Sequence, residues 1–437
     1  MTLLAALLLG ALALRQSFDW LVSWLNLGAL DPQVPERLRA VTDADAYRRS
    51  QDYTRERTLF GYVAGAAELI ALVAFWFAGG FGRLDAWLRT TEWSELAIGL
   101  AFLGVLLLAR TLFELPFAAY STFVLEKRFG FNRTSPRTFA LDVGKSLLLT
   151  AVLFGPLVAF LLALFQALGP AGWMIAWPAA AGLLVIIDLI YPVWILPLFH
   201  RLTPLPDGAL RSAIERAASD LGFALDGLAV IDASRRSTRS NAFVIGLGRR
   251  RRIVLSDTLI QRHDLPELVA IVAHEIGHAR RRHLPKLLAL SIAKAGLVVG
   301  AFALALDALA LHGALFVAQP SVHVALLAFA LLLGPFEVLL DLPSLALSRR
   351  FEFEADRFAA ERLDSGRELQ AALSRLSAQN LTNLTPHPLF VTTRSSHPPV
   401  LARLAALDRW PGMAAPETVS VENTARRRSR QTTEFRA

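Results

Sequence analysis

The sequence predicts a polytopic α-helical membrane protein, in which about seven transmembrane helices enclose a water-filled chamber and carry a small cytoplasmic α+β domain. Apolar residues make up 54% of the 437 residues and charged residues only 19%, against about 25% charged in ordinary soluble domains. The mean hydropathy is +0.44. Several apolar runs reach about 20 residues, the length that crosses a bilayer as a helix.

Seven apolar runs are candidate spans, near residues 3–25, 59–79, 95–117, 146–168, 172–196, 288–311 and 322–343. The first run resembles a secretory signal in position, but Arg15 and Asp19 interrupt it and no small-residue cleavage site follows cleanly. We therefore interpret it as a retained span. Residues 1–196 then form an N-terminal membrane region of five helices, and residues 288–343 supply helices six and seven.

The connections between the runs predict the orientation of the protein, because Lys and Arg accumulate on the cytoplasmic side of a membrane. The Lys- and Arg-rich segments are 31–58, 118–145, 197–287 and the tail after 344, and the poor ones are 80–94, 169–171 and 317–321. Rich and poor connections alternate strictly. We therefore expect a multi-pass protein of the cell membrane with its N-terminus outside and the 197–287 segment in the cytoplasm.

Ionisable residues fall within or at the ends of the apolar runs at eight positions, namely Glu68, Arg110, Glu114, Asp188, Lys294, Asp307, Glu337 and Asp341. Ionisable groups at membrane depth usually face a bundle interior or water. We therefore expect the helices to surround a hydrated cavity. The alternative is that these charges simply pair with one another, as Arg110 and Glu114 can at i and i+4.

The 197–287 segment is predicted to be a compact cytoplasmic insert. Helical spacing of apolar residues predicts a helix over 208–221, and short β-rich runs predict strands at 228–231, 241–246 and 252–255. Another helix follows from about Pro266, a residue favoured in the first turn. An edge strand beside this helix could hold an extended peptide by main-chain hydrogen bonds.

The chain after the last span is predicted to return to the cytoplasmic side over residues 344–411. Helices are predicted over 345–363, 366–379 and 398–408, around an Asn-, Thr- and Ser-rich loop at 380–396. Residues 412–437 are polar and Arg-rich and are predicted to be a disordered basic tail. We interpret this tail and the run Arg249–Arg252 as facing anionic lipid, and we expect no nucleic-acid partner.

The most informative motif is His274-Glu275-Ile276-Gly277-His278, an HExxH sequence. On a helix its two imidazoles lie at i and i+4, about 40° apart around the axis, so both can bind one zinc ion. Glu275 between them is then available to take a proton from a water molecule that the metal activates. The chain has no cysteine, which excludes disulfides, thiolate ligands and a Cys nucleophile.

A zinc hydrolase needs a third protein ligand and an open position for water. His283 lies five residues beyond His278, about 140° away around a helix, and is expected to face elsewhere. Glu352 is the better candidate, because Glu352 and Asp356 share one face of a predicted helix while Glu354 points about 160° away. Asp356 would then orient an imidazole N–H. The alternative is a charged amphipathic helix lying on the membrane.

HEIGH with a following SRRFEFEAD resembles the integral-membrane zinc metalloproteases of the CAAX prenyl protease 1 family, which are gluzincins. The likeness extends over nearly the whole chain. The other segments that carry it are Tyr120–Glu126, Phe129–Asn132, Pro197–Phe199, Pro204–Leu205, Ser240–Phe243 with Gly246, Ile253–Leu259, Asn380–Leu381 and Ser396–Pro399 with Arg403. HExxH alone is moderately specific, whereas all of these in order along a seven-span chain are highly specific.

The resemblance implies a role for each matching residue. His274, His278 and Glu352 would bind one zinc ion, Glu275 would be the general base, and Asp356 would support a ligand. His397 and Arg403 resemble residues near the reacting carbonyl and the substrate, and Asn241 lies on the strand that pairs with substrate. The insert 197–287 and the C-terminal part 344–411 would together form the catalytic domain. The alternatives are a loop-terminating turn at His397 and an ordinary turn or strand-start residue at Asn241.

We therefore expect a zinc-dependent endopeptidase at the cytoplasmic membrane face, acting on a peptide or protein substrate. The family implies removal of a C-terminal tripeptide from prenylated substrates. The Arg- and Ala-rich, Lys-poor composition looks bacterial, however, and most bacteria are not expected to make such substrates. One alternative is a quality-control protease without prenyl specificity. An alternative of another class is a transporter or scaffold with structural zinc, which Glu275 argues against.

Overall fold

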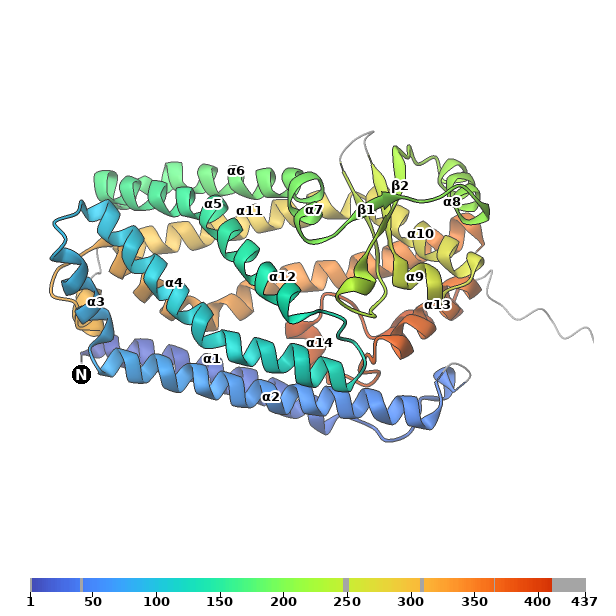
Figure 1. The fold of residues 1–437 in the computed structure, drawn as a ribbon, viewed down its shortest axis with the longest axis horizontal. Coiled ribbons are helices and arrows are strands. Elements are labelled where there is room, and N and C mark those ends of the chain that lie inside the picture. The colour runs from blue at the N-terminus through green and yellow to red at the C-terminus, as the bar shows by residue number, and fades with distance from the viewer. Residues whose placement is uncertain (1, 40–41, 247–250, 307–309, 365, 411–437) are drawn as a thin grey trace, which may run out of the picture.

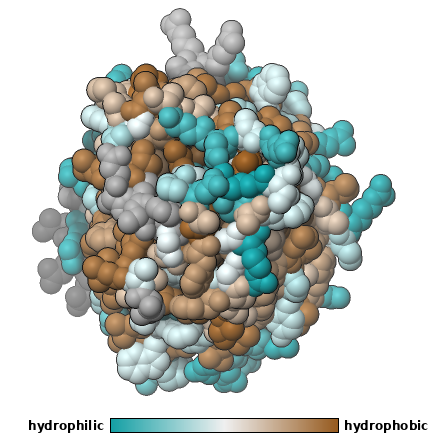
Figure 2. All heavy atoms as spheres, turned by 90° about the vertical axis from the view of Figure 1, so that its left-hand side faces the viewer, coloured by the Kyte–Doolittle hydropathy of each residue, from teal (hydrophilic) through white to brown (hydrophobic). Residues whose placement is uncertain are grey.

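The computed structural model describes residues 2–39, 42–246, 251–306, 310–364 and 366–410. Long helices run along the longest axis of the molecule, and the β-strands gather with shorter helices at one end (Figure 1). On the end face opposite the strands, hydrophobic and hydrophilic side chains alternate in small patches (Figure 2). The predicted disordered tail at 412–437 and the turn at Arg249 lie outside the described residues.

Apolar helices form the larger part of the structure. They are α1 (Leu3–Gly28), α2 (Ala44–Phe77), α4 (Glu95–Tyr120), α5 (Pro136–Leu168), α6 (Trp173–Ile190), α11 (His283–Leu306) and α12 (Val322–Leu363). Six helical segments of the described chain are long and apolar enough to cross a membrane. One of them, the 64-residue segment Pro136–Phe199, holds both α5 and α6, which pack on each other across the turn Gly169–Gly172. The prediction of about seven apolar spans is therefore confirmed.

Capping residues in the sequence determine where several of these helices begin. α2, α4 and α5 each follow a capping residue, Asp43, Ser94 and Ser135, whose side chain accepts a hydrogen bond from the backbone N–H three residues on. Pro136 then occupies the first turn of α5, where no backbone donor is needed. π-helical turns at Ser121–Glu126 and Tyr191–Ile195 extend α4 and α6, and the short helix α7 (Leu196–Phe199) leads out of the membrane region.

Polar contacts close the end of the bundle opposite the strands. The helix α3 (Gly80–Arg89) and the 3-10 helix Ala310–Leu315 lie there. The indole N–H of Trp76 donates to the carbonyl of Ala314 at 2.8 Å. His323 Nε2 lies 3.0 Å from Asp85 Oδ1, with both side chains buried.

Most of the ionisable residues in the apolar helices are paired. The ion pairs, at 2.5–3.6 Å, are Arg110 with Glu68 and Glu114, Lys294 with Asp341, and Arg15 with Glu337. A polar cavity of about 650 Å³ lies between α1 and α2, with Gln16, Asp19 and Arg57 in its lining. Ion pairing and a cavity with polar residues in its lining therefore occur together. Asp307 lies outside the described residues.

The insert contains a four-stranded sheet. Its strands are β1 (Leu202–Pro204), β2 (Gly227–Ile231), β3 (Ala242–Ile245) and β4 (Arg252–Ser256), in the order β1-β2-β4-β3. β2 and β4 are parallel, and the two outer pairs are antiparallel. Three strands and the helix α8 (Ala209–Asp220) were predicted. β1 was not, because a three-residue strand ending in proline has no recognisable period.

Two predictions for the C-terminal part are wrong. A break was expected after 343, with a new helix from 345, but α12 is one 42-residue helix that continues through Pro335 and Pro343. Each proline removes one backbone hydrogen bond without ending the helix. The loop expected at 380–396 contains the helix α14 (Pro388–Arg394). The helices α13 (Gly366–Gln379) and α15 (Val400–Asp408) agree with prediction.

A hydrophobic core holds the insert against the end of α12. It contains the inner face of the sheet, α8, α9 (Asp257–Arg262), α10 (Leu265–Arg280), α13 and α15. α10 lies directly on α12, and a Cβ added at Gly277 would meet the Ala355 Cα and Phe358 Cδ1 at 3.2 Å. Two helix backbones approach this closely only if one of them lacks a side chain at the crossing point.

We expect Gly277→Ala to lower the stability of the protein by about 1–3 kcal/mol, because the new methyl group would meet the Ala355 backbone and the Phe358 ring at 3.2–3.3 Å and push the two packed helices apart. The apparent unfolding temperature in detergent, followed by tryptophan fluorescence, measures the effect. Gly144→Ala in α5 is the matched control, since an added Cβ there meets nothing within 4 Å. Equal unfolding temperatures for the two variants would contradict the close-contact argument.

Candidate metal centre

Helix α10 presents the two histidines of the HExxH motif on one face. Its first turn is capped by Asp264, whose carboxylate accepts a hydrogen bond from the backbone N–H of Glu267 at 3.1 Å. The Nε2 atoms of His274 and His278 lie 3.1 Å apart. His274 is buried, and His278 is partly exposed. One helix therefore brings two imidazole nitrogens to a single point.

The carboxylate of Glu352 on α12 meets these nitrogens. Its oxygens lie 3.6 Å from His274 Nε2 and 3.5 Å from His278 Nε2. Within the described residues, these three side chains form the group whose donor atoms could share a metal ion. Tetrahedral zinc with bonds of about 2.05 Å requires ligand atoms about 3.3 Å apart, so the spacing fits. In addition, Glu352 Oε2 is buried and makes no hydrogen bond; its charged neighbours are Arg403 Nη1 at 3.0 Å and His274 Nε2 at 3.6 Å.

Asp356 contacts the ring nitrogen of His274 that does not face the other ligand candidates. Its Oδ1 lies 2.9 Å from His274 Nδ1, so Nε2 is left to face the other ligand atoms. Burial opposes protonation of His274, but hydrogen bonds to Asp356 and Glu352 outweigh it and raise the pKa of His274 to about 9. The pKa of His278 falls to about 3 because of burial and the charge of His274. The pair therefore holds one proton at neutral pH.

Arg403 binds both carboxylates. Its guanidinium donates to Asp356 at 2.8 and 2.5 Å and lies 3.0 Å from Glu352 Oε2. The residue is only 8% exposed. The resemblance implied a position near the substrate; in the structure Arg403 is buried against Glu352 and Asp356, where it compensates one of their two negative charges.

His283 contacts the centre in a way that sequence reasoning missed. Its Nδ1 lies 3.0 Å from His278 Nδ1, and its Nε2 lies 3.3 Å from Glu354 Oε2. The ring stacks on Phe351 with centroids 3.9 Å apart. α10 ends before His283, and Arg282 has a φ of 55°, so the helical angle used to exclude His283 does not apply. Each histidine of the motif is thus backed by a carboxylate of α12, one directly and one through His283.

Glu275 and His397 are more exposed than the ligand candidates His274 and Glu352. Part of the surface of Glu275 is exposed to solvent. Its carboxyl group is nevertheless packed among protein atoms, and this desolvation raises the pKa of Glu275 to about 7. His397 is 65% exposed, with its Nε2 3.2 Å from Glu352 Oε1. Ser396 Oγ lies 2.9 Å from His397 Nδ1. Both groups can reach a molecule that approaches the cluster.

Asn241 immediately precedes β3, which packs against α10. Its backbone N–H donates to Ser256 Oγ at 2.9 Å, and its side-chain oxygen accepts from the backbone N–H of Ala242 at 3.0 Å. Asn241 is therefore a strand-start residue in this structure. β3 has a ladder partner only on its β4 side among the described strands, so its outer edge is available for pairing.

The chain is similar to known proteins over almost its entire length. Two family profiles match it, one described as CAAX prenyl protease N-terminal, five membrane helices (residues 24–201), and one described as Peptidase family M48 (residues 204–411). A CAAX prenyl protease 1 homolog of Arabidopsis thaliana is 34% identical over 91% of this chain and 96% of its own. CAAX prenyl protease 1 of Saccharomyces cerevisiae is 32% identical over 86% and 89%. The crystal structure of S. mikatae Ste24p matches 93% of this chain and 100% of its own, with a TM-score of 0.87 and 28% identity.

We expect His283→Phe to weaken zinc binding by about tenfold or more, because it keeps a ring against Phe351 but removes the acceptor for His278 Nδ1. Competition with a chelator measures the affinity, and the unfolding temperature of the metal-free protein measures the packing. His323→Phe is the control, since it removes a matched buried His–Asp pair at the other end of the bundle. A loss of affinity in both variants alike would reject the role of His283.

We also expect zinc binding at pH 7 to release about one proton. At pH 7 His274 holds this proton, because its pKa is about 9. A nitrogen that binds a metal must be deprotonated, so the proton leaves when zinc binds. Since protons compete with the metal below that pKa, apparent affinity should fall by about tenfold for each pH unit below 9. Calorimetric titration in two buffers of different ionisation enthalpy measures the proton count, and a count of zero would contradict the assignment.

Proposed function

We propose that the metal centre of this chain is a zinc site that cleaves peptide bonds at the cytoplasmic membrane face. The chain belongs to the CAAX prenyl protease 1 family of M48 peptidases. The protein is an integral multi-pass membrane metalloendopeptidase. The observation that carries the proposal is the meeting of His274, His278 and Glu352 at zinc-ligand spacing, with Glu275 beside them. Because the chain belongs to a peptidase family, a transporter or scaffold with a structural zinc is not the better explanation of the site.

Zinc is the metal that this donor set favours. Two imidazoles and one carboxylate form the ligand set of many catalytic zinc sites, which leave a fourth position open. When bound, zinc would acidify a water molecule and polarise the scissile carbonyl. Asp356 and His283 would hold the two imidazoles in the tautomer and orientation that a ligand needs, and Arg403 would hold Glu352 and Asp356 ionised.

Glu275 would serve as the general base. With a pKa of about 7, its carboxyl group is partly ionised at neutral pH. A nearby cation would lower this pKa and increase the ionised fraction. Above its pKa the carboxylate can take a proton from the attacking water, and the resulting carboxylic acid can pass the proton to the leaving amine. The base form is lost as pH falls through the pKa, so activity should decline toward acid pH.

His397 would stabilise the negative charge that develops on the carbonyl oxygen. It is 65% exposed, and Ser396 can fix its Nδ1. Its Nε2, which faces Glu352 Oε1 at 3.2 Å in this structure, would turn to the substrate oxygen once Glu352 holds zinc. Removing one such donor typically lowers the rate by about 10²–10³. The outer edge of β3 would hold the peptide in extended form by main-chain hydrogen bonds, and Asn241 would shape the start of that edge.

The proposed substrate is a prenylated protein from which a C-terminal tripeptide is removed. Support comes from relatives named CAAX prenyl protease 1 that align over at least 86% of this chain. A protease without prenyl specificity is the second candidate, favoured by the Arg- and Ala-rich composition. The Lys- and Arg-rich connections support an external N-terminus and a cytoplasmic centre.

We expect Glu275→Gln to bind one zinc ion while its kcat falls by about 10²–10⁴, because the amide cannot accept a proton. Zinc content by mass spectrometry and cleavage of a farnesylated peptide that ends in a CAAX sequence are the two measurements. Glu215→Gln, an exposed glutamate of α8, is the matched control.

The same assay distinguishes the substrate classes. A farnesylated peptide cleaved at a much higher kcat/KM than its unmodified counterpart supports prenyl specificity, and equal values support the broader protease. Turnover by Glu275→Gln equal to that of the parent would reject the mechanism for both.

A further inference from the structure

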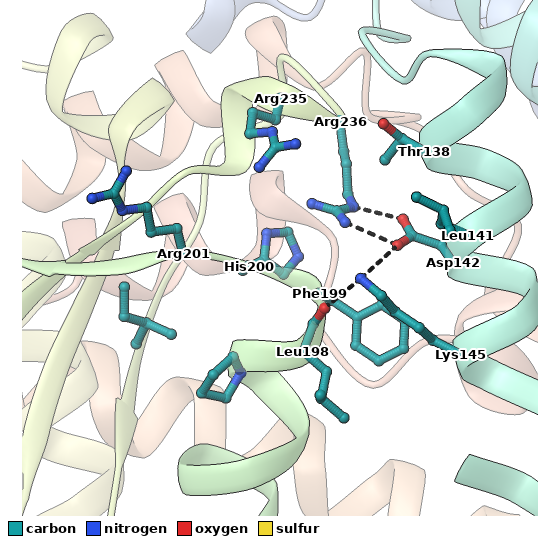
Figure 3. A pocket seen from close by; sticks show the side chains of 12 residues that line it. Thr138, Leu141, Asp142, Lys145, Leu198, Phe199, His200, Arg201, Arg235 and Arg236 are labelled. Atoms are coloured by element: carbon teal, nitrogen blue, oxygen red, sulfur yellow. Dashed lines mark hydrogen bonds and ion pairs between the residues drawn. The ribbon is translucent and has the colours of Figure 1, made fainter. Parts of the chain in front are cut away.

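A second cavity, of about 500 Å³, lies at the opposite edge of the sheet from β3 (Figure 3). The start of α5, the end of α7, β1 and the turn at Arg235 and Arg236 line it. In the strand order β1-β2-β4-β3, the outer strands are three positions apart, or about 14 Å at the usual strand spacing. This cavity, the edge pocket, is therefore separate from the edge at which a substrate peptide would pair.

Basic groups surround the edge pocket. Four cations line it, Lys145, Arg201, Arg235 and Arg236, against one carboxylate, Asp142. A second carboxylate, Asp232, lies 3.6 Å from Arg235, so the surroundings keep a net charge of about two positive units. An excess of cations around one cavity favours an anionic ligand.

One donor of the edge pocket, on Arg236, is left without a partner. Arg236 donates through Nε and Nη2 to Asp142 at 2.8 and 3.0 Å, but its Nη1 is buried and makes no hydrogen bond. His200 Nδ1 is buried and makes no hydrogen bond, but it lies 3.6 Å from Asp232 Oδ1. The guanidinium of Arg201 makes no ion pair with any residue of the described chain, and Arg235 is 65% exposed. Guanidinium groups of this kind match the oxygens of a phosphate.

The other side of the edge pocket is apolar and continues along a membrane helix. Leu141, Leu198 and Phe199 line the cavity. Leu148 stands two turns beyond Leu141 on the same face of α5, and both leucines are more than half exposed. Trp194, at 72% exposure, lies just before α7, and tryptophan is enriched at the level of lipid headgroups.

We propose that the edge pocket binds the phosphate of an anionic phospholipid, with the acyl chains lying along Leu141 and Leu148 of α5. Arg236 Nη1, Arg201 and Arg235 supply donors to the phosphate, while the pair Arg236–Asp142 holds the insert against α5. The adjoining apolar face distinguishes a lipid from a free anion, because a free anion gains nothing from the leucines. Lipid binding at this edge goes beyond peptide cleavage and depends on none of the residues of the metal centre.

The test uses the full chain in detergent micelles, titrated with phosphatidylglycerol or phosphatidylcholine, with bound lipids counted by native mass spectrometry. We expect phosphatidylglycerol to bind more tightly. The double variant Arg201→Gln/Arg235→Gln should weaken that binding by about 25-fold, since each cation near anionic lipid contributes about fivefold. It leaves the Arg236–Asp142 pair intact, so folding and peptidase activity should not change.

Arg48→Gln/Arg216→Gln is the matched control, because it removes two exposed cations outside the edge pocket. Phosphatidylglycerol binding that is unchanged in the pocket variant, or weakened equally in the control, overturns the proposal. A third arm adds glycerol 3-phosphate as the soluble headgroup. Displacement of the lipid by this anion at similar concentration also overturns the proposal, since it would identify a free-anion site.

Discussion

The close contact between α10 and α12 is the constraint on which the rest of the structure depends. A metal ion requires its ligand atoms about 3.3 Å apart, and the third ligand is 74 residues beyond the second in the chain. Gly277 lies between the two histidine turns of α10 and lets Ala355 approach without a side chain between the helices. Glu352, one turn before Ala355, then reaches both imidazoles.

Charge balance is the second condition. Glu352 and Asp356 are two buried carboxylates within one turn of α12, and burying an unpaired carboxylate costs several kcal/mol. Arg403 compensates one of these charges, and the raised pKa of His274 supplies a second positive charge in the absence of a metal. A divalent cation would take the place of that proton. The cluster is therefore built to exchange a proton for a metal ion while remaining nearly neutral.

The continuity of α12 joins the membrane region to the centre. Because the helix does not break at Pro343, the nine residues from Pro343 to Glu352 place the ligand about 13 Å further along the same rigid axis. The insert is attached at a second place by the pair of Arg236 with Asp142 of α5. Both attachments join the centre to the apolar helices.

Local patterns in the sequence determined the apolar spans, the strands β2 to β4, and the two-histidine face of α10, because each depends on a period or a cap within one element. The shared face of Glu352 and Asp356 was predictable for the same reason. Only the tertiary structure decided that Arg403 lies behind the ligands, that His283 supports His278, and that α12 continues through two prolines. These features depend on how separate elements pack, on a turn with a positive φ at Arg282, and on hydrogen bonds between residues far apart in the chain. No periodicity in the sequence encodes such contacts.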